Sequence, residues 1–513
     1  MTYDLLVPAQ LSAALLPDLL LMAGAMLLML VAAWRPDSAT HQRTVGFLSL
    51  GLVVATIGAV VWMALRGDTA EPTGIIAVDG FRWMVDLVVL LGAAGTIALA
   101  IESNDRDGIT QAESHVLVLF AASGMMVLAA ARDLMVVFLG IEIMSVAVYV
   151  LAGLDRRNPR SAEASLKYFL LGAFATGFLL YGIALVYGAT GSTQFAGITA
   201  AIRQHILGED PMLLVGIGLL LVGFGFKVAA APFHMWAPDV YDGAPTPITA
   251  FMAATVKAAA FATFLRVWYE AFFLAFSGWA HAVWWLAAVT MLVGNVIALS
   301  QRNIKRMLAY SSIVHSGYLL VAIVASSAFA STAFTFYVFA YTLATFGAFA
   351  IVATLQGDGR REALIADYEG LWHVRPWLAV GMAVCLLALM GFPVFGGVGF
   401  FAKWYLVQAA LSSPAGLAIL AVVLVVTSVI SAGYYLQIVR VMFMKPRPEG
   451  AEAPAPMGTL ARAVVLVSVA LILVLGLFPS SLATITVSNG FRPYTALERL
   501  EPTAPGFSTS PLR

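Results

Sequence analysis

The chain has 513 residues, of which 61% are hydrophobic and 11% are charged. Soluble domains have about 25% charged residues, so this composition indicates a membrane protein. Basic and acidic residues number 28 each, and this balance gives no net field that would attract nucleic acid. The single cysteine, Cys385, excludes an internal disulfide and a cysteine-ligated iron–sulfur cluster, which needs about four thiolates.

Apolar runs long enough to cross a bilayer recur along the chain. A spanning helix needs about 17 to 25 apolar residues, and roughly fourteen such runs are present. The first has no basic residue before it, so we expect a retained helix rather than a cleaved signal. The predicted spans are 11–33, 44–65, 81–101, 115–131, 133–154, 166–188, 211–231, 247–273, 281–299, 305–325, 328–355, 376–410, 415–440 and 461–480. The sequence therefore predicts an all-α, polytopic membrane protein.

The basic residues of the loops are distributed unevenly. With the N-terminus outside, sixteen Lys and Arg residues fall in inner loops and seven in outer loops and the C-terminal tail, with Arg82 counted among the outer ones. Basic loops stay in the cytoplasm, and an even number of spans puts both termini on one side. We expect a multi-pass protein of the bacterial inner (plasma) membrane with both termini on the outer, periplasmic side.

Two predicted spans contain helix-breaking residues. One is followed by four prolines at 232–247, and the other contains GFPVFGG at 391–397. Proline removes a backbone donor and glycine tolerates unwinding, so each span is predicted to be a broken helix. We expect non-helical backbone at about 229–238 and 391–399, shielded from lipid because lipid offers no hydrogen bonds.

The two breaks occupy equivalent places in the order of helices. Counting from the fourth span, a break falls in the fourth of five helices, and again in the fourth of the next five. An odd number of helices per unit inverts the second copy, which is the pattern of inverted-repeat transporters. The sequence therefore predicts three N-terminal helices (1–114), two inverted five-helix repeats (115–273 and 281–440), and a last helix with a polar tail (461–513).

Ionisable residues inside the predicted spans are the candidate functional residues. Glu142 lies about nine residues from either end of its span, which is near the bilayer centre at about 1.5 Å per residue. Such a carboxylate is retained mainly when it has a cationic partner or a proton to carry. Lys227, one turn before the first break, is the expected partner. The alternative is a permanently protonated carboxyl that only packs.

Five further residues extend this set. Lys257 lies inside the span after the first break, and Lys403 follows the second break. His234 titrates near neutral pH and has the chemistry to pass a proton between lysines, unless it is only a packing group. Lys167 either takes part or extends its amine to the interface. His315, among Ser and Tyr residues, either holds water or forms interhelical hydrogen bonds.

Other signals narrow the function. Arg266 precedes Glu270 by four residues, a spacing that favours a plain ion pair. The sequence has no Gly-rich nucleotide-binding loop, no H-E-x-x-H and no His/Cys cluster with metal spacing. Nucleotide hydrolysis, dehydrogenation and a metal centre in this chain are therefore unsupported. What remains is a row of ionisable groups at mid-membrane depth, which is typical of a proton path.

Four segments, at 138–158, 227–261, 303–320 and 391–411, resemble the antiporter-like membrane subunits of proton-pumping NADH:quinone oxidoreductase, respiratory complex I. The resemblance covers essentially all the predicted spans, and KVAAAPFHMWAPDVYDGAPTPITAFMAATVKAAAF is its most specific part. Within this family the chain most resembles the N subunits. The L and M subunits usually carry a histidine-containing segment where this sequence has Lys257, and the M subunits usually carry a glutamate where it has Lys403. The second break departs from many relatives, which have two prolines and one glycine.

The resemblance implies roles for individual residues. The implied proton-translocating residues are Glu142, Lys227, Lys257 and Lys403, and the implied accessory residues are His234 and Lys167. We group His315 with the accessory residues. The resemblance also implies that this chain holds no cofactor or redox centre, and that NAD, FMN, iron–sulfur clusters and quinone are bound by partner subunits.

We therefore expect a proton-translocating subunit of a hetero-oligomeric NADH:quinone oxidoreductase, embedded in the bilayer beside other membrane subunits. One alternative is a subunit of a multi-subunit cation/proton antiporter. The segment around Lys257 is the feature that distinguishes the oxidoreductase subunit from this alternative. A second is a non-translocating scaffold, which predicts that Lys227→Met and Glu142→Gln are harmless. A membrane acyltransferase using His234 is disfavoured, because no base or nucleophile is apparent nearby.

Overall fold

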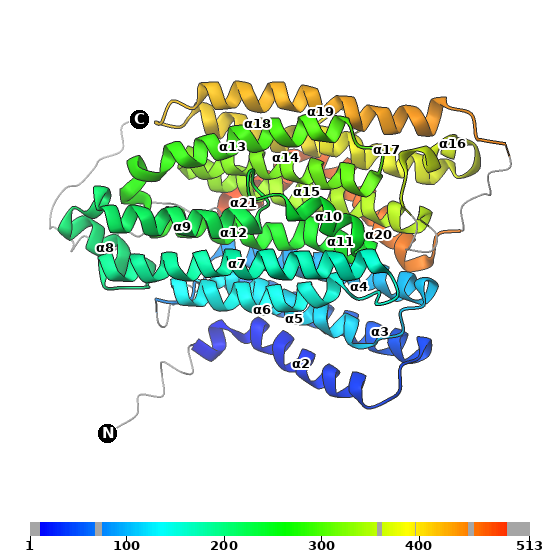
Figure 1. Ribbon diagram of the computed structural model, residues 1–513, viewed down its shortest axis with the longest axis horizontal. Helices are drawn as coiled ribbons and strands as arrows, with labels where there is room; N and C mark the ends of the chain where they lie inside the picture. Colours follow the sequence, from blue (N-terminus) through cyan, green and yellow to red (C-terminus); the bar gives the residue numbers. More distant parts are fainter. Residues whose placement is uncertain (1–10, 67–73, 357–361, 396, 450–455, 490–513) are drawn as a thin grey trace.

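The computed structural model describes residues 11–66, 74–356, 362–395, 397–449 and 456–489. Throughout these residues the regular structure is helical, apart from isolated β-bridges such as Ile76 with Ala131. The long helices run alongside one another, from α2 (Leu16–Ala33) at the bottom of the view to α19 (Ala418–Met444) at the top (Figure 1). The prediction of an all-α fold is confirmed.

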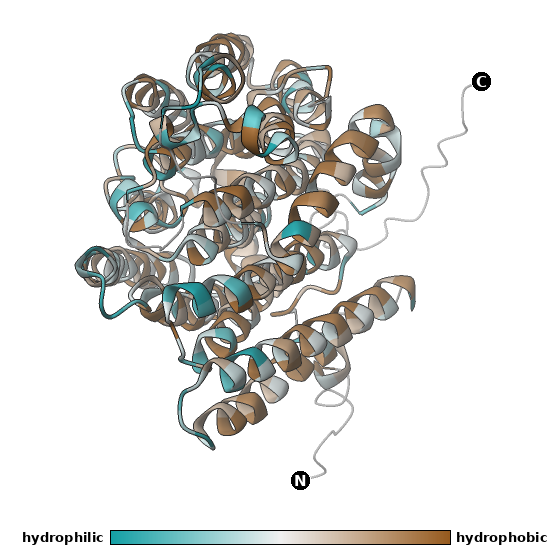
Figure 2. Cartoon of the chain, turned by 90° about the vertical axis from the view of Figure 1, so that its right-hand side faces the viewer, coloured by the Kyte–Doolittle hydropathy of each residue, from teal (hydrophilic) through white to brown (hydrophobic). Residues whose placement is uncertain are grey.

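The number of spans agrees with the prediction. Twelve helices in the described residues are long and apolar enough to cross a membrane, and two shorter apolar helices, α9 (Pro211–Lys227) and α17 (Pro376–Met390), bring the number to fourteen. Figure 2, a view along the bundle, shows hydrophobic residues over most of the helices and hydrophilic residues in the turns that face the viewer.

The remaining long helices begin and end within a few residues of the predicted spans. They are α3 (Ala39–Arg66), α4 (Gly80–Asp107), α5 (Glu113–Ala130), α6 (Leu134–Ala152), α7 (Pro159–Thr190), α11 (Thr246–Phe251) continued through the π-helical turn η2 (Met252–Val256) into α12 (Lys257–Glu270), α13 (Phe276–Leu299), α14 (Ile304–Ala325), α15 (Ala328–Leu355) and α20 (Thr459–Leu477).

The first break lies between α9 and α10 (Trp236–Gly243), and its backbone at 228–235 is not helical. The break ends earlier than predicted because Pro238 falls in the first turn of α10, where its missing N–H is tolerated. The residues at 228–231 are buried, and the Trp236 indole N–H donates to the carbonyl of Phe226 at 3.0 Å. Pro232 and Met235 in the same break are exposed, Met235 by 71%, so the chain covers only the first half of this break.

The second break is exposed. Gly391 ends α17 with a φ of 82°, the turn continues to Phe395, and α18 (Gly397–Leu411) follows. Phe395 is 65% exposed, so the chain by itself does not cover this break, and its shielding from lipid stays a prediction. The first break leads into the helix α10, which packs against α7 and α14, and the second leads into α18, which packs against α14, α15 and α20. Non-helical backbone at membrane depth is tolerated only where protein or a water-filled cavity covers it.

The order of helices matches the predicted repeats. The series α5, α6, α7, broken α9–α10 and α11–α12 is followed by α13, α14, α15, broken α17–α18 and α19. In each series the fourth span is the broken one. The division into two units remains a prediction that rests on this order.

The predicted inner and outer loops separate to opposite ends of the bundle. The short helix α8 (Phe195–His205), in a predicted outer loop, lies at the left of Figure 1, and α16 (Leu371–Val374), in a predicted inner loop, lies at the right. Arg82 is a correction to the loop assignment. It lies in the first turn of α4 and is buried, so it is not a loop charge.

Cysteine labelling tests which end faces the cytoplasm. Arg157 and Arg203 are both exposed, and they lie in a predicted inner loop and a predicted outer loop. On a Cys385→Ala background, we expect a membrane-impermeant maleimide to label Arg203→Cys in intact cells. Arg157→Cys should react only after the cells are permeabilised. The reverse pattern would show that the orientation is inverted.

Candidate functional site

Lys227 ends α9 at the edge of the first break. Its ammonium donates to the Ser145 hydroxyl at 2.7 Å and to the Tyr149 hydroxyl at 3.0 Å, both on α6. It also lies 5.3 Å from the centre of the Tyr149 ring and 6.0 Å from that of Tyr168, within the range of cation–π attraction. The buried charge is therefore held by neutral hydroxyls and aromatic faces.

Glu142 lies on the same face of α6 as these hydroxyls. It precedes Ser145 by three residues and Tyr149 by seven, which is the helical repeat of one face. Within the described residues, no hydrogen bond or ion pair joins Glu142 to Lys227. The structure therefore does not bring the predicted pair into contact: Ser145 occupies the position facing the ammonium. Glu142 lies about one helical turn from Ser145 along α6, and one turn of an α-helix rises about 5.4 Å.

Lys257 lies directly after the π-helical turn η2 and is held by α14. Its ammonium donates to the Ser312 carbonyl at 2.8 Å, the Ser312 hydroxyl at 2.6 Å and the Ser316 hydroxyl at 3.0 Å. These three acceptors satisfy its three donors. The Ser316 hydroxyl donates in turn to the carbonyl of Val228 at 2.6 Å. The lysine is thus connected to the first break, next to Lys227.

His315 is fixed through both ring nitrogens. Nδ1 lies 2.6 Å from the Tyr337 hydroxyl and Nε2 lies 3.2 Å from the Tyr435 hydroxyl, which itself bonds to Ser311. Of the two readings left open by the sequence, interhelical hydrogen bonding is therefore observed. A cavity of about 10 Å³, lined by His315, Tyr337 and Lys403 among others, adjoins it. This is the room that a single water molecule needs.

Lys403, on α18, is held by the end of the preceding helix. Its ammonium donates to the carbonyl of Met390, the last residue of α17, at 2.8 Å, and lies 4.8 Å from the centre of the Tyr318 ring. Helix C-termini carry partial negative charge, so the broken helix itself provides a counter-dipole for the ammonium. The same lysine also lines a cavity of about 350 Å³ with Phe392 and other residues of the exposed second break.

Lys167 and His234 lie apart from these direct contacts. Lys167 is half-exposed and pairs with Glu163 at 2.6 Å and with Asp239 at 2.8 Å, and Asp239 also binds Arg306 at 2.7 Å. His234 is partly buried in the first break, and within the described residues its Nδ1 has no hydrogen-bond partner. No hydrogen bond in the described chain joins His234 to either neighbouring lysine.

Several residues that complete the site were not singled out from the sequence. They are Ser145, Tyr149, Tyr337, Tyr341, Tyr435 and Asp239, whereas Ser312 and Ser316 belong to the polar stretch that the sequence shows around His315. A signal for two pairs was present, since Ser145 with Tyr149 and Ser312 with Ser316 repeat at four residues inside apolar helices.

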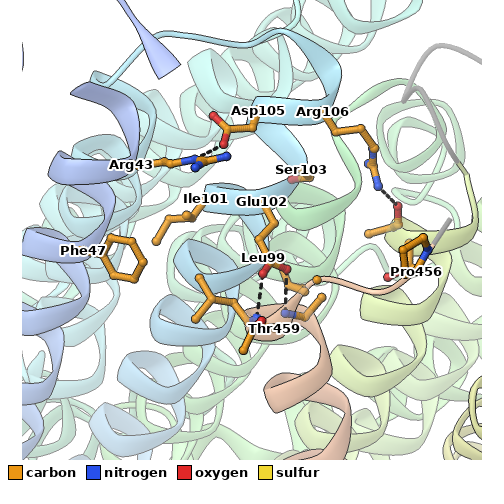
Figure 3. A pocket seen from close by; sticks show the side chains of 15 residues that line it. Arg43, Phe47, Leu99, Ile101, Glu102, Ser103, Asp105, Arg106, Pro456 and Thr459 are labelled. Carbon is orange, nitrogen blue, oxygen red and sulfur yellow. Dashed lines mark hydrogen bonds and ion pairs between the residues drawn. The ribbon is translucent and has the colours of Figure 1, made fainter. Parts of the chain in front are cut away.

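A larger cavity, of about 540 Å³, lies between α3, α4 and α20 and contains none of the predicted site residues (Figure 3). Glu102 points to the start of α20, where it accepts hydrogen bonds from the N–H groups of Leu460 at 2.8 Å and Ala461 at 3.0 Å. Arg43 pairs with Asp105 at its edge. The polar groups here cap a helix and pair with each other, so the arrangement is a structural joint.

A buried charge cluster closes the opposite end of α12. Arg266 binds both oxygens of Asp79, at 2.8 and 2.9 Å, and Glu270 at 3.0 Å, while Arg132 binds Glu270 at 3.0 Å. The predicted ion pair is therefore confirmed as part of a larger cluster. Burial of Asp79 disfavours its charged form, but Arg266 and Arg132 outweigh this and hold the Asp79 pKa at about 2.

The comparisons with known proteins agree with this architecture. The model of the family described as NADH:quinone oxidoreductase/Mrp antiporter, TM, matches residues 131–431. The chain belongs to this family. It is 52% identical over 477 residues to NADH-quinone oxidoreductase subunit N of Gemmatimonas aurantiaca, a match that covers 91% of each chain. It is 42% identical over 436 residues to the subunit N of Trichlorobacter lovleyi, covering 85% of this chain and 88% of the relative.

Solved structures give the same result. A chain of respiratory complex I from Thermus thermophilus with bound aureothin matches with a TM-score of 0.76 and 35% identity, covering 92% of this chain and all of that one. A chain of the Mrp complex from Dietzia sp. matches with a TM-score of 0.80 at 20% identity, and this likeness shows the shared fold alone.

Removing the charge of Asp79 should lower the stability of the protein more than removing the charge of Asp239. Arg266 beside Asp79 is 1% exposed, so we expect Asp79→Asn to destabilise the protein by about 3–5 kcal/mol, because a buried cation loses its main partner. Asp239 is 37% exposed, so we expect Asp239→Asn to cost about 1 kcal/mol or less. Thermal unfolding of the assembled protein in membranes measures both. Equal losses would contradict this assignment.

Proposed function

We propose that this chain is the N-type, proton-translocating membrane subunit of a bacterial NADH:quinone oxidoreductase, complex I. One observation carries the proposal: three lysines in the membrane-spanning region, Lys227, Lys257 and Lys403, are 2%, 2% and 7% exposed, and each is held by hydroxyls, carbonyls or aromatic rings rather than by a carboxylate. Ionisable residues inside membrane spans mark proton and ion pathways, and these three have no permanent ion pair within the described residues.

The first step of the proposed path uses Glu142 and Lys227. A carboxylate within about 4–6 Å of a buried ammonium stabilises the charge by about 1.4–4 kcal/mol. Moving one proton against 100 mV takes about 2.3 kcal/mol, so the free energy gained and lost when this contact forms and breaks is of the size that proton transfer requires. In the state described here the contact is open and Ser145 faces the ammonium.

The next steps follow the hydroxyl groups. From the first break, Ser316 and Ser312 surround Lys257, and the Tyr341 hydroxyl donates to Ser312 at 3.0 Å. The His315 group and the one-water cavity then lie between Lys257 and Lys403. Within this proposal, His234 and Lys167 are accessory groups at the side where protons enter.

Redox chemistry belongs to other subunits in this proposal. NAD, FMN, iron–sulfur clusters and quinone are bound by partner subunits, and this chain supplies the membrane path that is coupled to quinone reduction. The exposed second break supports a hetero-oligomer, because a neighbouring membrane subunit would cover Phe392 and Phe395. The subunit lies in the inner membrane with both termini outside, as the basic inner loops indicate.

A cation/proton antiporter subunit is the second candidate, and the fold match to the Mrp complex is compatible with it. Two findings favour the oxidoreductase. The relatives that cover most of this chain at 52% and 42% identity are named as oxidoreductase subunits, and the T. thermophilus complex I chain is 35% identical, against 20% for the Mrp chain.

Replacing Lys227 by Met tests the proposal. The change keeps volume and apolar contact but removes the titratable group, so the complex should assemble while NADH:quinone activity and proton pumping in sealed membrane vesicles fall at least about tenfold. Lys445→Met is the matched control, because Lys445 is half-exposed and pairs with Glu369 away from the site. Normal activity with a normal proton ratio in Lys227→Met would favour the scaffold alternative.

A further inference from the structure

Three charged residues meet inside the N-terminal helices, outside the lysine row. Arg82, in the first turn of α4, donates to the Asp18 carboxylate of α2 at 2.5 Å and lies 3.4 Å from the Asp86 carboxylate one turn further along α4. It also donates to the carbonyls of Ala14 at 3.1 Å and Ala77 at 2.9 Å. The side chains of Arg82 and Asp86 are fully buried and that of Asp18 nearly so. We call these three residues the Asp18–Arg82–Asp86 triad.

The triad has more acceptors than donors. Among the described residues, neither oxygen of Asp86 and only one oxygen of Asp18 receives a hydrogen bond. Nε of Arg82 lies 3.4 Å from the Asp86 carboxylate, but the two groups are not aligned to form a hydrogen bond. A buried carboxylate normally has donors on both oxygens, so Asp86 lacks what an ionised side chain requires.

The surrounding charges make the imbalance larger. Two ionised carboxylates around one guanidinium would leave a net negative charge in a buried site. The other charged group that faces Asp86 is Asp79, whose carboxylate accepts the backbone N–H of Arg82 at 2.8 Å. Asp79 is itself ionised and paired with Arg266 of α12. Asp86 therefore faces one cation that is already bound to Asp18, and two negative groups.

The ligand that resolves this imbalance is a proton. A metal cation at Asp86 would lie against the guanidinium of Arg82, which repels it. A proton neutralises one carboxyl without adding charge beside Arg82, and it converts one oxygen of Asp86 into a donor. Asp18 makes the shorter contact with Arg82, so Asp18 is the ionised partner and Asp86 the protonated one.

We propose that the Asp18–Arg82–Asp86 triad is a proton-binding site in which Asp86 carries one proton at neutral pH while Asp18 pairs with Arg82. When the site releases its proton, the Asp86 O–H bond breaks, the proton passes to water, and Arg82 is left between two carboxylates. The site lies at the end of α4 that adjoins the Asp79–Arg266 cluster, on the predicted outer side.

The position of the triad on α4 connects it to the lysine row. Gly92, about 9 Å further along α4 at 1.5 Å per residue, packs so closely on η2 that an added Cβ would lie 2.0 Å from the Thr255 hydroxyl. The π-helical turn η2 directly precedes Lys257. One rigid helix thus contacts both the triad and the turn that places Lys257, and only this functional connection rests on the proposed function.

Infrared spectroscopy of the complete purified complex tests the proton. The wild type at neutral pH should show the C=O stretching band of a protonated carboxylic acid, sensitive to D2O, that Asp86→Asn lacks. Asp133→Asn is the matched control, because Asp133 caps α6 through the N–H of Met135 at 2.7 Å and accepts from Thr193 at 2.7 Å. Asparagine caps a helix about as well, and the control should lose no band.

Assembly provides a second readout. Asp86→Asn imitates the protonated acid and should assemble, and Asp18→Asn should assemble as well because Asp86 then ionises to pair with Arg82. The double variant leaves Arg82 buried without an anion, so the complex should be lost from the membrane. An unchanged band in Asp86→Asn, or failure of Asp86→Asn to assemble, would overturn the proposal. Because neither readout measures pumping, these failures are distinct from a failure of the proposed function.

Discussion

Burying an ammonium group among hydroxyls and helix ends, rather than beside a carboxylate, is the constraint on which the rest of this structure depends. A charge at membrane depth is expensive, and a permanent ion pair would reduce that cost while fixing the proton in place. Each of the three lysines instead has neutral acceptors: Ser145 and Tyr149 for Lys227, and the end of a helix for Lys403. Each ammonium is therefore stabilised without a permanent ion pair.

The broken helices supply the places where this is possible. Lys227 is the last residue of α9, and Lys403 reaches back to the last carbonyl of α17. A continuous helix would have spent that carbonyl on an internal hydrogen bond. The ends of the bundle are built differently, since Arg266, Asp79 and Glu270 form fixed ion pairs at one end of α12. The charged residues at this end of α12 are thus paired with one another, whereas the three lysines have neutral acceptors.

Much of this could be predicted from the sequence, because the signals are local. Apolar length gives the spans, prolines and glycines give the two breaks, and isolated Lys and Glu residues mark the site. The partners of those residues lie on other helices, and one-dimensional spacing does not encode which hydroxyl faces which lysine. Glu142 illustrates this, because the sequence pairs it with Lys227 whereas the structure places Ser145 there.

Two other differences have the same origin. The sequence places Arg82 in a loop, because it follows one directly. In the structure its side chain is buried among the helices, where it pairs with Asp18 of α2. The sequence predicts that both breaks are covered, but Met235 in the first break and Phe395 in the second are 71% and 65% exposed in this chain. Both outcomes depend on tertiary neighbours. The exposed residues of the second break mark the surface at which the proposed neighbouring subunit would pack.

The most direct test of the account compares two substitutions of Glu142 in sealed vesicles that contain the assembled complex. Glu142→Gln keeps the shape but removes the charge that contact with Lys227 requires, whereas Glu142→Asp keeps the charge on a shorter arm. NADH-driven proton pumping is measured in both, with assembly checked by the amount of complex in the membrane. We predict that Gln impairs pumping much more than Asp while both assemble. Equal effects of Gln and Asp, or a Gln defect explained by failed assembly, would show that Glu142 is a packing residue and would contradict the account.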